Sequence, residues 1–288
     1  MKKIQLSELE YDDTKVGVGS RSKVYSLSNG KLLKLYEDSY LENERLFGVN
    51  TEDKILDSQN RKTPIEIIRP EAAIYDGRKF VGEIITAANG VRFDNWVKQL
   101  DYKECRNLEM YANIFNRLES IIKNTPDIVY PDICNYDNIF VSDNGRKIEL
   151  IDYEGLQIGN YPTLSFSSAL GDVSQYNNSS KYCRGLAPGS VARLYTKELD
   201  VRSLIYFYFR VIFDLDLNIV AQNALYLDAM LDLIEMQTNL KDPDIMHKVW
   251  KLFQEKEKNE YLGEDVFRIA ETYNLDIYPN GIRRLIRK

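Results

Sequence analysis

The chain has 288 residues, of which 44% are hydrophobic and 28% are charged, a balance that is ordinary for a soluble globular protein. No apolar run approaches the roughly 20 residues that cross a bilayer, so we expect no membrane span. The net charge of −6 argues against nucleic-acid partners, and three widely spaced cysteines with a single histidine argue against a disulfide framework and exclude a multi-histidine metal site. These features fit a cytoplasmic protein.

The first predicted elements are antiparallel strands that follow a glycine-rich turn. Gly17 and Gly19 lead into a polar tip, residues 23–27 alternate as a strand does, and residues 31–36 form the next strand, which carries Lys34. Glycines at such a turn let the backbone approach a phosphate, which free N–H groups can bind. Lys34 has apolar neighbours and therefore needs an anionic partner.

A short helical pattern follows at residues 40–48. It carries Glu42 and Glu44, and either of them is a candidate to meet Lys34. Residues 50–63 are polar and are expected to form a loop or a frayed helix.

Three strand-like stretches come next, at residues 65–68, 72–75 and 80–85, with an Asp-Gly turn between the last two. We therefore expect about five strands before Thr86. The strand pattern breaks at residues 87–90, where we place a boundary between two lobes.

Beyond this boundary the chain turns helical. Helices are expected at residues 93–100 and 102–123. The second presents an apolar face made of Leu108, Tyr111, Ala112, Phe115, Leu118, Ile121 and Ile122.

A β-hairpin is predicted within residues 130–155. Two apolar runs, 138–141 and 148–151, flank a Ser-Asp-Asn-Gly turn. Acidic and amide side chains stand at both open ends of this hairpin: Asp132, Asp137, Asn138, Asp152 and Glu154. Because a hairpin brings its open ends together, these oxygen ligands should converge, as Mg²⁺ and a phosphate-bearing substrate require.

Residues 156–185 have little periodicity, and a loop of this length is usually functional or mobile. Residues 198–213 form an almost wholly apolar helix, which should be buried. Asp200, near its start, is either a cap or a buried anchor. Further amphipathic helices are expected at 223–237, 244–257 and 263–273.

This order of elements resembles the protein-kinase superfamily, in a divergent form of bacterial or phage type, over about residues 10–280. GVGSRSKVY looks like the glycine-rich loop, and LLKLY places Lys34 as the lysine of the third strand. YPDICNYDN looks like the catalytic loop, and IDYEG looks like the magnesium loop. LAPG, at 186–189, stands where the activation segment would close, and YTKELDVRSL resembles the start of the central hydrophobic helix.

The resemblance implies an α+β fold with two lobes. The N-terminal lobe, residues 1–86, would be an antiparallel sheet with one helix, and residues 87–91 would be the hinge. Residues 92–288 would form a mainly helical C-terminal lobe, with the activation segment at 152–189.

The resemblance also implies ATP and Mg²⁺ as cofactors and a role for each matching residue. Lys34 would hold the α- and β-phosphates, and Glu44 or Glu42 would orient it. Asp132 would accept or orient the proton of the substrate hydroxyl, while Asn138 and Asp152 would bind Mg²⁺. Asp200 would brace the backbone of the catalytic loop. The nucleotide contacts would include Gly17, Val18, Gly19, Ser20, Val24, Glu44, Thr86 and Ala88.

The chain departs from the family pattern at several positions. Tyr130 replaces a histidine, and Glu154 stands where the magnesium loop has glycine. Five residues separate Asp132 from Asn138 where the family has four, so either the loop bulges by one residue or Asp137 takes the metal position.

We expect an ATP- and Mg²⁺-dependent phosphotransferase that acts on a hydroxyl, and a protein Ser/Thr kinase first. The motivation is Ala187-Pro188 followed by the central helix. The partner would be a protein substrate, including the chain itself by autophosphorylation; hydroxyl groups between residues 161 and 182, Ser165 among them, are candidate sites. The alternatives are a pseudokinase that binds nucleotide and a small-molecule kinase of aminoglycoside or choline type.

Overall fold

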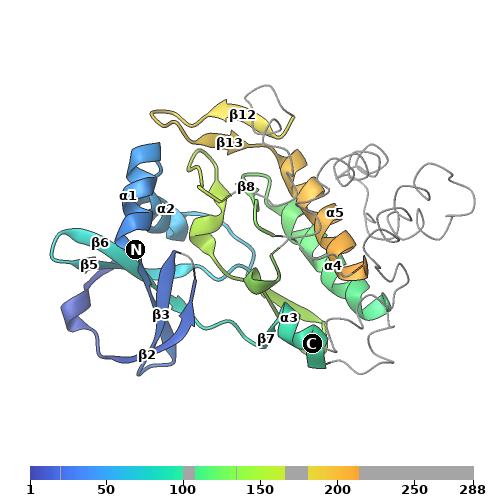
Figure 1. Cartoon of the computed structure of the whole chain (residues 1–288), viewed down its shortest axis with the longest axis horizontal. Helices are drawn as coiled ribbons and strands as arrows, with labels where there is room; N and C mark the ends of the chain where they lie inside the picture. The colour runs from blue at the N-terminus through green and yellow to red at the C-terminus, as the bar shows by residue number, and fades with distance from the viewer. Residues whose placement is uncertain (20, 100–107, 134, 166–180, 214–288) are drawn as a thin grey trace, which may run out of the picture.

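The computed structural model describes residues 1–19, 21–99, 108–133, 135–165 and 181–213 (Figure 1). Its N-terminal part is a six-stranded sheet with the strand order β1-β5-β6-β4-β3-β2. The strands are β1 (Lys2–Gln5), β2 (Tyr11–Val18), β3 (Ser22–Leu27), β4 (Lys31–Tyr36), β5 (Pro70–Asp76) and β6 (Lys79–Thr86). The expected strands at 23–27, 31–36, 72–75 and 80–85 are confirmed.

The register of this sheet places four residues in one row. Gly17 is opposite Val24, Val24 is opposite Lys34, and Lys34 is opposite Glu83. Residues directly opposite one another on neighbouring strands share a face of the sheet. The row therefore presents a side-chain-free position, a valine, a lysine and a glutamate toward the same side.

Three expectations for this region were wrong in part. The sheet is mixed, because β1 runs parallel to β5 and adds a sixth strand that the polar N-terminus did not suggest. Residues 50–63 contain a helix, so that two helices follow β4. Residues 65–68 are not a strand of this sheet: Ile67 makes one isolated bridge to Leu150, and Ile65 is 91% exposed. Apolar β-branched composition alone does not make a strand where no edge is offered for pairing.

Helices α1 (Asp38–Phe47) and α2 (Thr51–Asp57) pack on the face of the sheet toward which Lys34 points. The buried cluster there comprises Tyr36, Tyr40, Leu41, Ile55, Ala73, Tyr75 and Phe80. On the opposite face a second cluster is packed against Leu6 of the 3-10 turn η1 (Leu6–Glu8) and against Leu9. This cluster comprises Leu27, Leu33, Ala72, Ile74 and Ile84.

After β6 the chain forms small sheets and helices. The strands are β7 (Val91–Arg92), β8 (Ile128–Val129), β9 (Ile139–Ser142), β10 (Lys147–Leu150), β11 (Gln157–Ile158), β12 (Cys183–Leu186) and β13 (Arg193–Tyr195). The helices are α3 (Phe93–Gln99), α4 (Leu108–Asn124) and α5 (Lys197–Phe213). Short 3-10 turns are η2 (Ser58–Asn60), η4 (Tyr136–Asn138) and η5 (Tyr153–Gly155).

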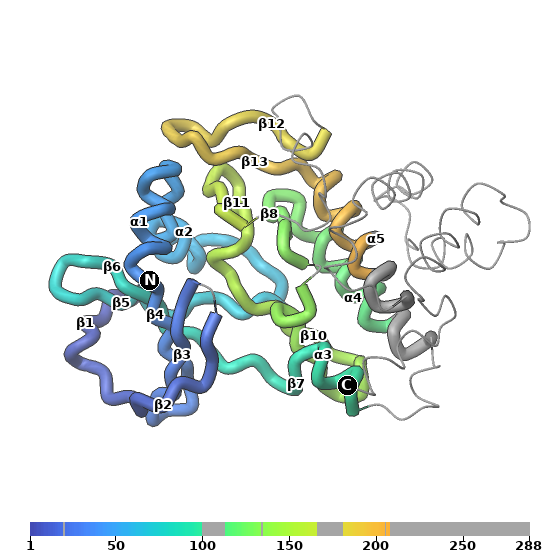
Figure 2. The backbone as a smooth tube through the Cα atoms, viewed as in Figure 1, coloured from blue at the N-terminus to red at the C-terminus, as the bar shows by residue number. Residues whose placement is uncertain are grey.

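Helices α4 and α5 lie side by side (Figure 2). Phe207 of α5 is fully buried and contacts the rings of Phe93, Phe115 and Tyr136. Aromatic side chains of α3, α4, α5 and η4 thus form one core beneath the hairpin.

The predicted hairpin is confirmed as β9 and β10, with Ile148 opposite Val141. Its turn contains Asp143 and Asn144 at positive φ (54° and 52°), a conformation that Asp and Asn tolerate better than most residues. The helix expected at 198–213 is confirmed as α5, and residues 199–204 of it are buried as expected.

The described residues form an α+β structure, with a mixed sheet and helices followed by smaller sheets and further helices. The helices expected at 223–237, 244–257 and 263–273 lie outside the described residues, as does the middle of the expected activation segment. Within the described part, no helix has the length and apolar character needed to cross a bilayer.

Candidate active site

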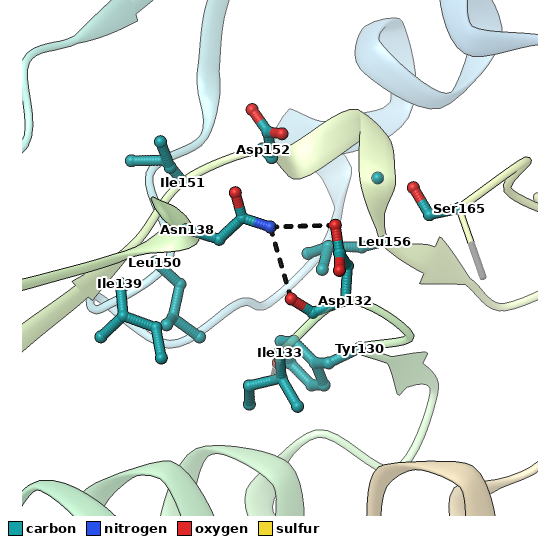
Figure 3. A pocket seen from close by; sticks show the side chains of 11 residues that line it. Tyr130, Asp132, Ile133, Asn138, Ile139, Leu150, Ile151, Asp152, Leu156 and Ser165 are labelled. Carbon is teal, nitrogen blue, oxygen red and sulfur yellow. Dashed lines mark hydrogen bonds between the residues drawn. The ribbon is translucent and has the colours of Figure 1, made fainter. Parts of the chain in front are cut away.

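A pocket lies at the open end of the β9–β10 hairpin, where the oxygen-bearing side chains were expected to converge (Figure 3). Asp132, Asn138 and Asp152 line it together with Gly155 and Ser165. Its apolar wall is made by Tyr130, Ile133, Ile139, Leu150, Ile151 and Leu156. The hairpin therefore brings the candidate catalytic and metal-binding residues to one place.

Asn138, and not Asp137, faces the pocket. The Asn138 Nδ2 donates to the carboxylate and to the backbone carbonyl of Asp132, at 3.3 Å in both cases. Asp137 is exposed and pairs with Arg92 at 3.3 Å. The 3-10 turn η4 accommodates the extra residue of this loop, since its N-cap, Asn135, accepts a hydrogen bond from the Asp137 backbone N–H.

Lys34 is 4% exposed and reaches the end of the hairpin from β4. Its Nζ donates to Asp152 Oδ1 at 2.6 Å and to Glu154 Oε1 at 2.5 Å. Burial lowers the pKa of Lys34, but the carboxylates of Glu154 and Asp152 outweigh burial, and the net shift is upward. The ammonium is therefore charged at every pH of interest.

The expectation that Glu44 or Glu42 orients Lys34 is therefore corrected. Glu44 accepts a hydrogen bond from the Tyr40 hydroxyl at 2.6 Å, one turn earlier on α1, and Glu42 is exposed to solvent. Glu154 takes the place beside Lys34 because it follows Asp152 in the tight turn η5, and its side chain is turned inward, 1% exposed. The position where the family has glycine thus supplies the partner of the lysine.

A second buried lysine holds this turn. The Lys54 Nζ of α2 donates to the backbone carbonyls of Glu154 and Leu156, at 2.8 Å each. Burial lowers the pKa of Lys54 to about 8, against the opposing charges of Glu44 and Glu154. Helix α2 is thereby tied to the segment that carries Asp152.

Glu83 is a buried carboxyl that the sequence analysis did not single out. It lies beside Lys34 on β6 and is 1% exposed, and within the described residues its Oε2 has no hydrogen-bond partner. Burial, with the nearby charge of Glu154, raises its pKa to about 8. The sequence does contain a signal for this buried carboxyl, because Glu83 stands between Gly82 and Ile84 in a strand of apolar residues.

The two aspartates of the pocket differ in their electrostatics. Burial raises the pKa of Asp132, and the charge of Asp152 adds to this effect while Arg21 opposes it. For Asp152 burial acts in the same direction, but the charge and hydrogen bond of Lys34 outweigh it and lower the pKa. Asp152 is thus held as an anion, whereas Asp132 is shifted toward the range of a proton acceptor.

Asp200 braces the start of the loop that carries Asp132. It is fully buried at the start of α5, and its Oδ1 accepts the backbone N–H of Tyr130 at 2.6 Å. Lys197 forms an ion pair with its other oxygen. Tyr130, in place of histidine, hydrogen-bonds Thr125 through its hydroxyl at 2.9 Å.

The expected nucleotide contacts divide into two groups. Gly17 and Val24 lie in the same row of the sheet as Lys34, next to it. Val18 is 70% exposed and Gly19 closes a turn by donating to Ser22, while Ser20 lies outside the described residues. At the other end of the sheet Thr86 is exposed and donates to Glu71 at 2.5 Å, and Ala88 is half-buried beyond it.

Arg21 is a further residue that the sequence analysis did not assign, although it stands in the polar tip beside the glycines. Its Nη1 donates to the Ser165 Oγ at 2.6 Å, and its guanidinium lies over the ring of Tyr40, 5.6 Å from the centroid. It thereby connects the turn between β2 and β3 to the segment that follows β11.

The donor set at the pocket fits a magnesium ion that completes its shell with water and phosphate oxygens. Within the described residues no three His, Cys, Asp or Glu side chains form a metal cluster of their own. Figure 3 shows the Asn138 amide oxygen turned toward Asp152, while the amide nitrogen is turned toward Asp132. Mg²⁺ is commonly bound by one or two carboxylates with substrate phosphates, so Asp152 and Asn138 would suffice.

No protein-family model matches the sequence, and no curated protein matches it significantly.

Proposed function

We propose that the chain is an ATP- and Mg²⁺-dependent phosphotransferase with a bilobal, protein-kinase-like fold that transfers the γ-phosphate to a hydroxyl group. The observation that carries the proposal is the 2.6 Å bond between Lys34 and Asp152, residues 118 positions apart, beside the Asn138–Asp132 contact. The pocket thus holds a carboxylate suited to accept a proton and two oxygen ligands suited to a metal, and a buried cation is bonded to one of these ligands.

Each residue has a distinct task in this proposal. Lys34 binds phosphate oxygens, and Asp152 and Asn138 hold the metal ion, which supplies positive charge at the phosphoryl oxygens. Asp132, with its raised pKa, orients the acceptor hydroxyl and takes its proton. Asp200 keeps the backbone of this loop in place through Tyr130.

A protein serine or threonine is the acceptor that we propose first. The turn between β12 and β13 is ordered, since Ala187 is buried and its N–H donates to the carbonyl of Ala192 at 2.9 Å. In this proposal a peptide acceptor lies against this turn, which precedes α5. A small-molecule acceptor is the second candidate, favoured by the acidic Glu154 in the magnesium loop, which also occurs in small-molecule kinases.

The test is transfer of labelled phosphate from ATP with Mg²⁺, offered casein, the chain itself, choline and an aminoglycoside. Asp152→Asn should reduce transfer by about 10²-fold or more, because a group that acts at the transition state is lost. Asp137→Asn is the matched control, since Asp137 belongs to the same loop but faces Arg92 and solvent; it should retain activity.

The outcomes separate the candidates. Label on casein or on the chain supports the protein kinase, and label only on a small molecule supports the second candidate. Binding of ATP without transfer to any acceptor would leave a nucleotide-binding regulator, and equal activity of the Asp152 and Asp137 variants would show that the metal site is misassigned.

A further inference from the structure

Arg21 contacts the edge of the candidate active site through Ser165, and among the described residues it forms no ion pair with a carboxylate. Within the described residues its polar side-chain contact is a neutral hydroxyl, that of Ser165, at 2.6 Å. Its charge nevertheless lies near the site, because Ser165 lines the pocket together with Asp132 and Asp152. A guanidinium has five N–H donors and is matched to carboxylate or phosphate, so one hydroxyl leaves most of its capacity unused.

The position of Arg21 is built and not incidental. Its backbone carbonyl accepts the N–H of Glu37 at 2.9 Å, immediately before α1. Its guanidinium rests over Tyr40, whose hydroxyl is held by Glu44 at 2.6 Å. Glu44 bonds Tyr40 and not Lys34, and it thereby holds the ring over which the Arg21 guanidinium lies.

The charge balance of the pocket calls for such a cation. Lys34 already donates to two carboxylates, Asp152 and Glu154, and Glu83 lies beside it. Lys34 with its two partners therefore carries a net negative charge before any phosphate enters. A triphosphate that enters this site needs a further positive group, and Arg21 is bonded to Ser165, which lines the pocket together with Asp132.

We propose that Arg21 binds the terminal phosphate of the nucleoside triphosphate, and that the Ser165 hydroxyl occupies its guanidinium until the phosphate displaces it. The proposal rests on the proposed phosphotransferase function and adds a specificity-determining residue to the same site. A charge-assisted bond between guanidinium and phosphate is stronger than one to a neutral hydroxyl, so the exchange favours the bound nucleotide.

The experiment measures the affinity of a non-hydrolysable ATP analogue and of ADP, each with Mg²⁺, by calorimetric titration. Arg21→Ala should weaken the binding of the ATP analogue by about 10- to 100-fold. It should weaken the binding of ADP much less, because ADP lacks the third phosphate. Arg21→Lys should recover part of the loss. Ser165→Ala should instead tighten the binding of the ATP analogue by about two- to tenfold, because the hydroxyl that competes for Arg21 is removed.

Lys23→Ala is the matched control. Lys23 is a cation of β3, two residues after Arg21, but it forms an exposed pair with Glu37 at 2.7 Å. Its removal should leave both affinities unchanged.

A merely structural contact predicts a different result: Arg21→Ala and Ser165→Ala would then act alike, and the ratio of ATP-analogue to ADP affinity would stay constant. Either finding overturns the proposal while nucleotide binding stands. If the wild-type chain binds neither nucleotide, the proposed function fails, and the role of Arg21 fails with it.

Discussion

Removal of the Lys34 ammonium tests the buried charge cluster most directly. Lys34→Met keeps most of the volume but leaves Asp152 and Glu154 without their cation. The side chain of Asp152 is 38% exposed and can regain water, whereas that of Glu154 is 1% exposed and cannot. Glu154 must then bind a proton in order to remain buried.

The cost of that protonation gives the magnitude. Holding a carboxyl with an ordinary pKa of 4.5 neutral at pH 7 costs about 3.4 kcal/mol, and only about 0.7 kcal/mol at pH 5. The first figure agrees with the 3–5 kcal/mol that usually follows when one partner of a buried ion pair is removed. Lys34→Met should therefore lose about 3 kcal/mol of unfolding free energy at pH 7 and far less at pH 5.

The assay is urea unfolding of the wild type, Lys34→Met, Glu154→Gln and the double variant at both pH values. In the double variant the carboxyl that required a proton is gone, so most of the loss at pH 7 should be recovered. Lys23→Met, which removes an exposed partner of Glu37, should leave the midpoint close to that of the wild type. A loss below about 1 kcal/mol for Lys34→Met at pH 7, or no recovery in the double variant, would refute the reasoning.

Two further predictions concern single residues. Because folding raises the pKa of Glu83 from 4.5 to about 8, the stabilisation linked to its protonation is complete below about pH 4.5 and is lost as the pH rises through 8. Glu83→Gln should therefore flatten the decline of the urea midpoint between about pH 5 and about pH 8, and a variant with the wild-type slope would exclude Glu83 as its origin. Gly48 ends α1 at φ +71°, and a Cβ added there would lie 2.8 Å from the Cα of Ser190. Gly48→Ala should cost about 2 kcal/mol or more in urea unfolding, against about 1 kcal/mol for Gly30→Ala, which has φ +77° and open space; equal losses would show that the contact with Ser190 is not tight.

Local patterns were sufficient to predict several elements. The hairpin of β9 and β10 follows from two apolar runs around an Asp-Asn-Gly turn, and the alternation of residues 31–36 predicts the strand that carries Lys34. The buried helix α5 follows from its nearly continuous apolar composition. In each case the residues that decide the structure lie within about one element of each other.

The N-terminal strand and residues 65–68 show where local patterns fail. β1 is polar in composition and becomes a strand because the edge of β5 is available to it. Residues 65–68 have strand-like composition but reach only the end of β10, where Leu150 N–H donates to Glu66 at 2.7 Å. Strand formation depends on a partner edge, and the sequence of one segment does not contain that information.

The sequence by itself determined which side chains can do chemistry at this site: a lysine among apolar neighbours, and aspartates and an asparagine at the two ends of one hairpin. Only the tertiary structure decided how they pair. Lys34 meets Glu154 and not Glu44, because Lys54 of α2 draws the turn after Asp152 inward while Tyr40 holds Glu44. Several carboxylates could pair with Lys34 by their chemistry alone. Long-range packing selects Glu154, whose burial is compensated by the charge of the lysine.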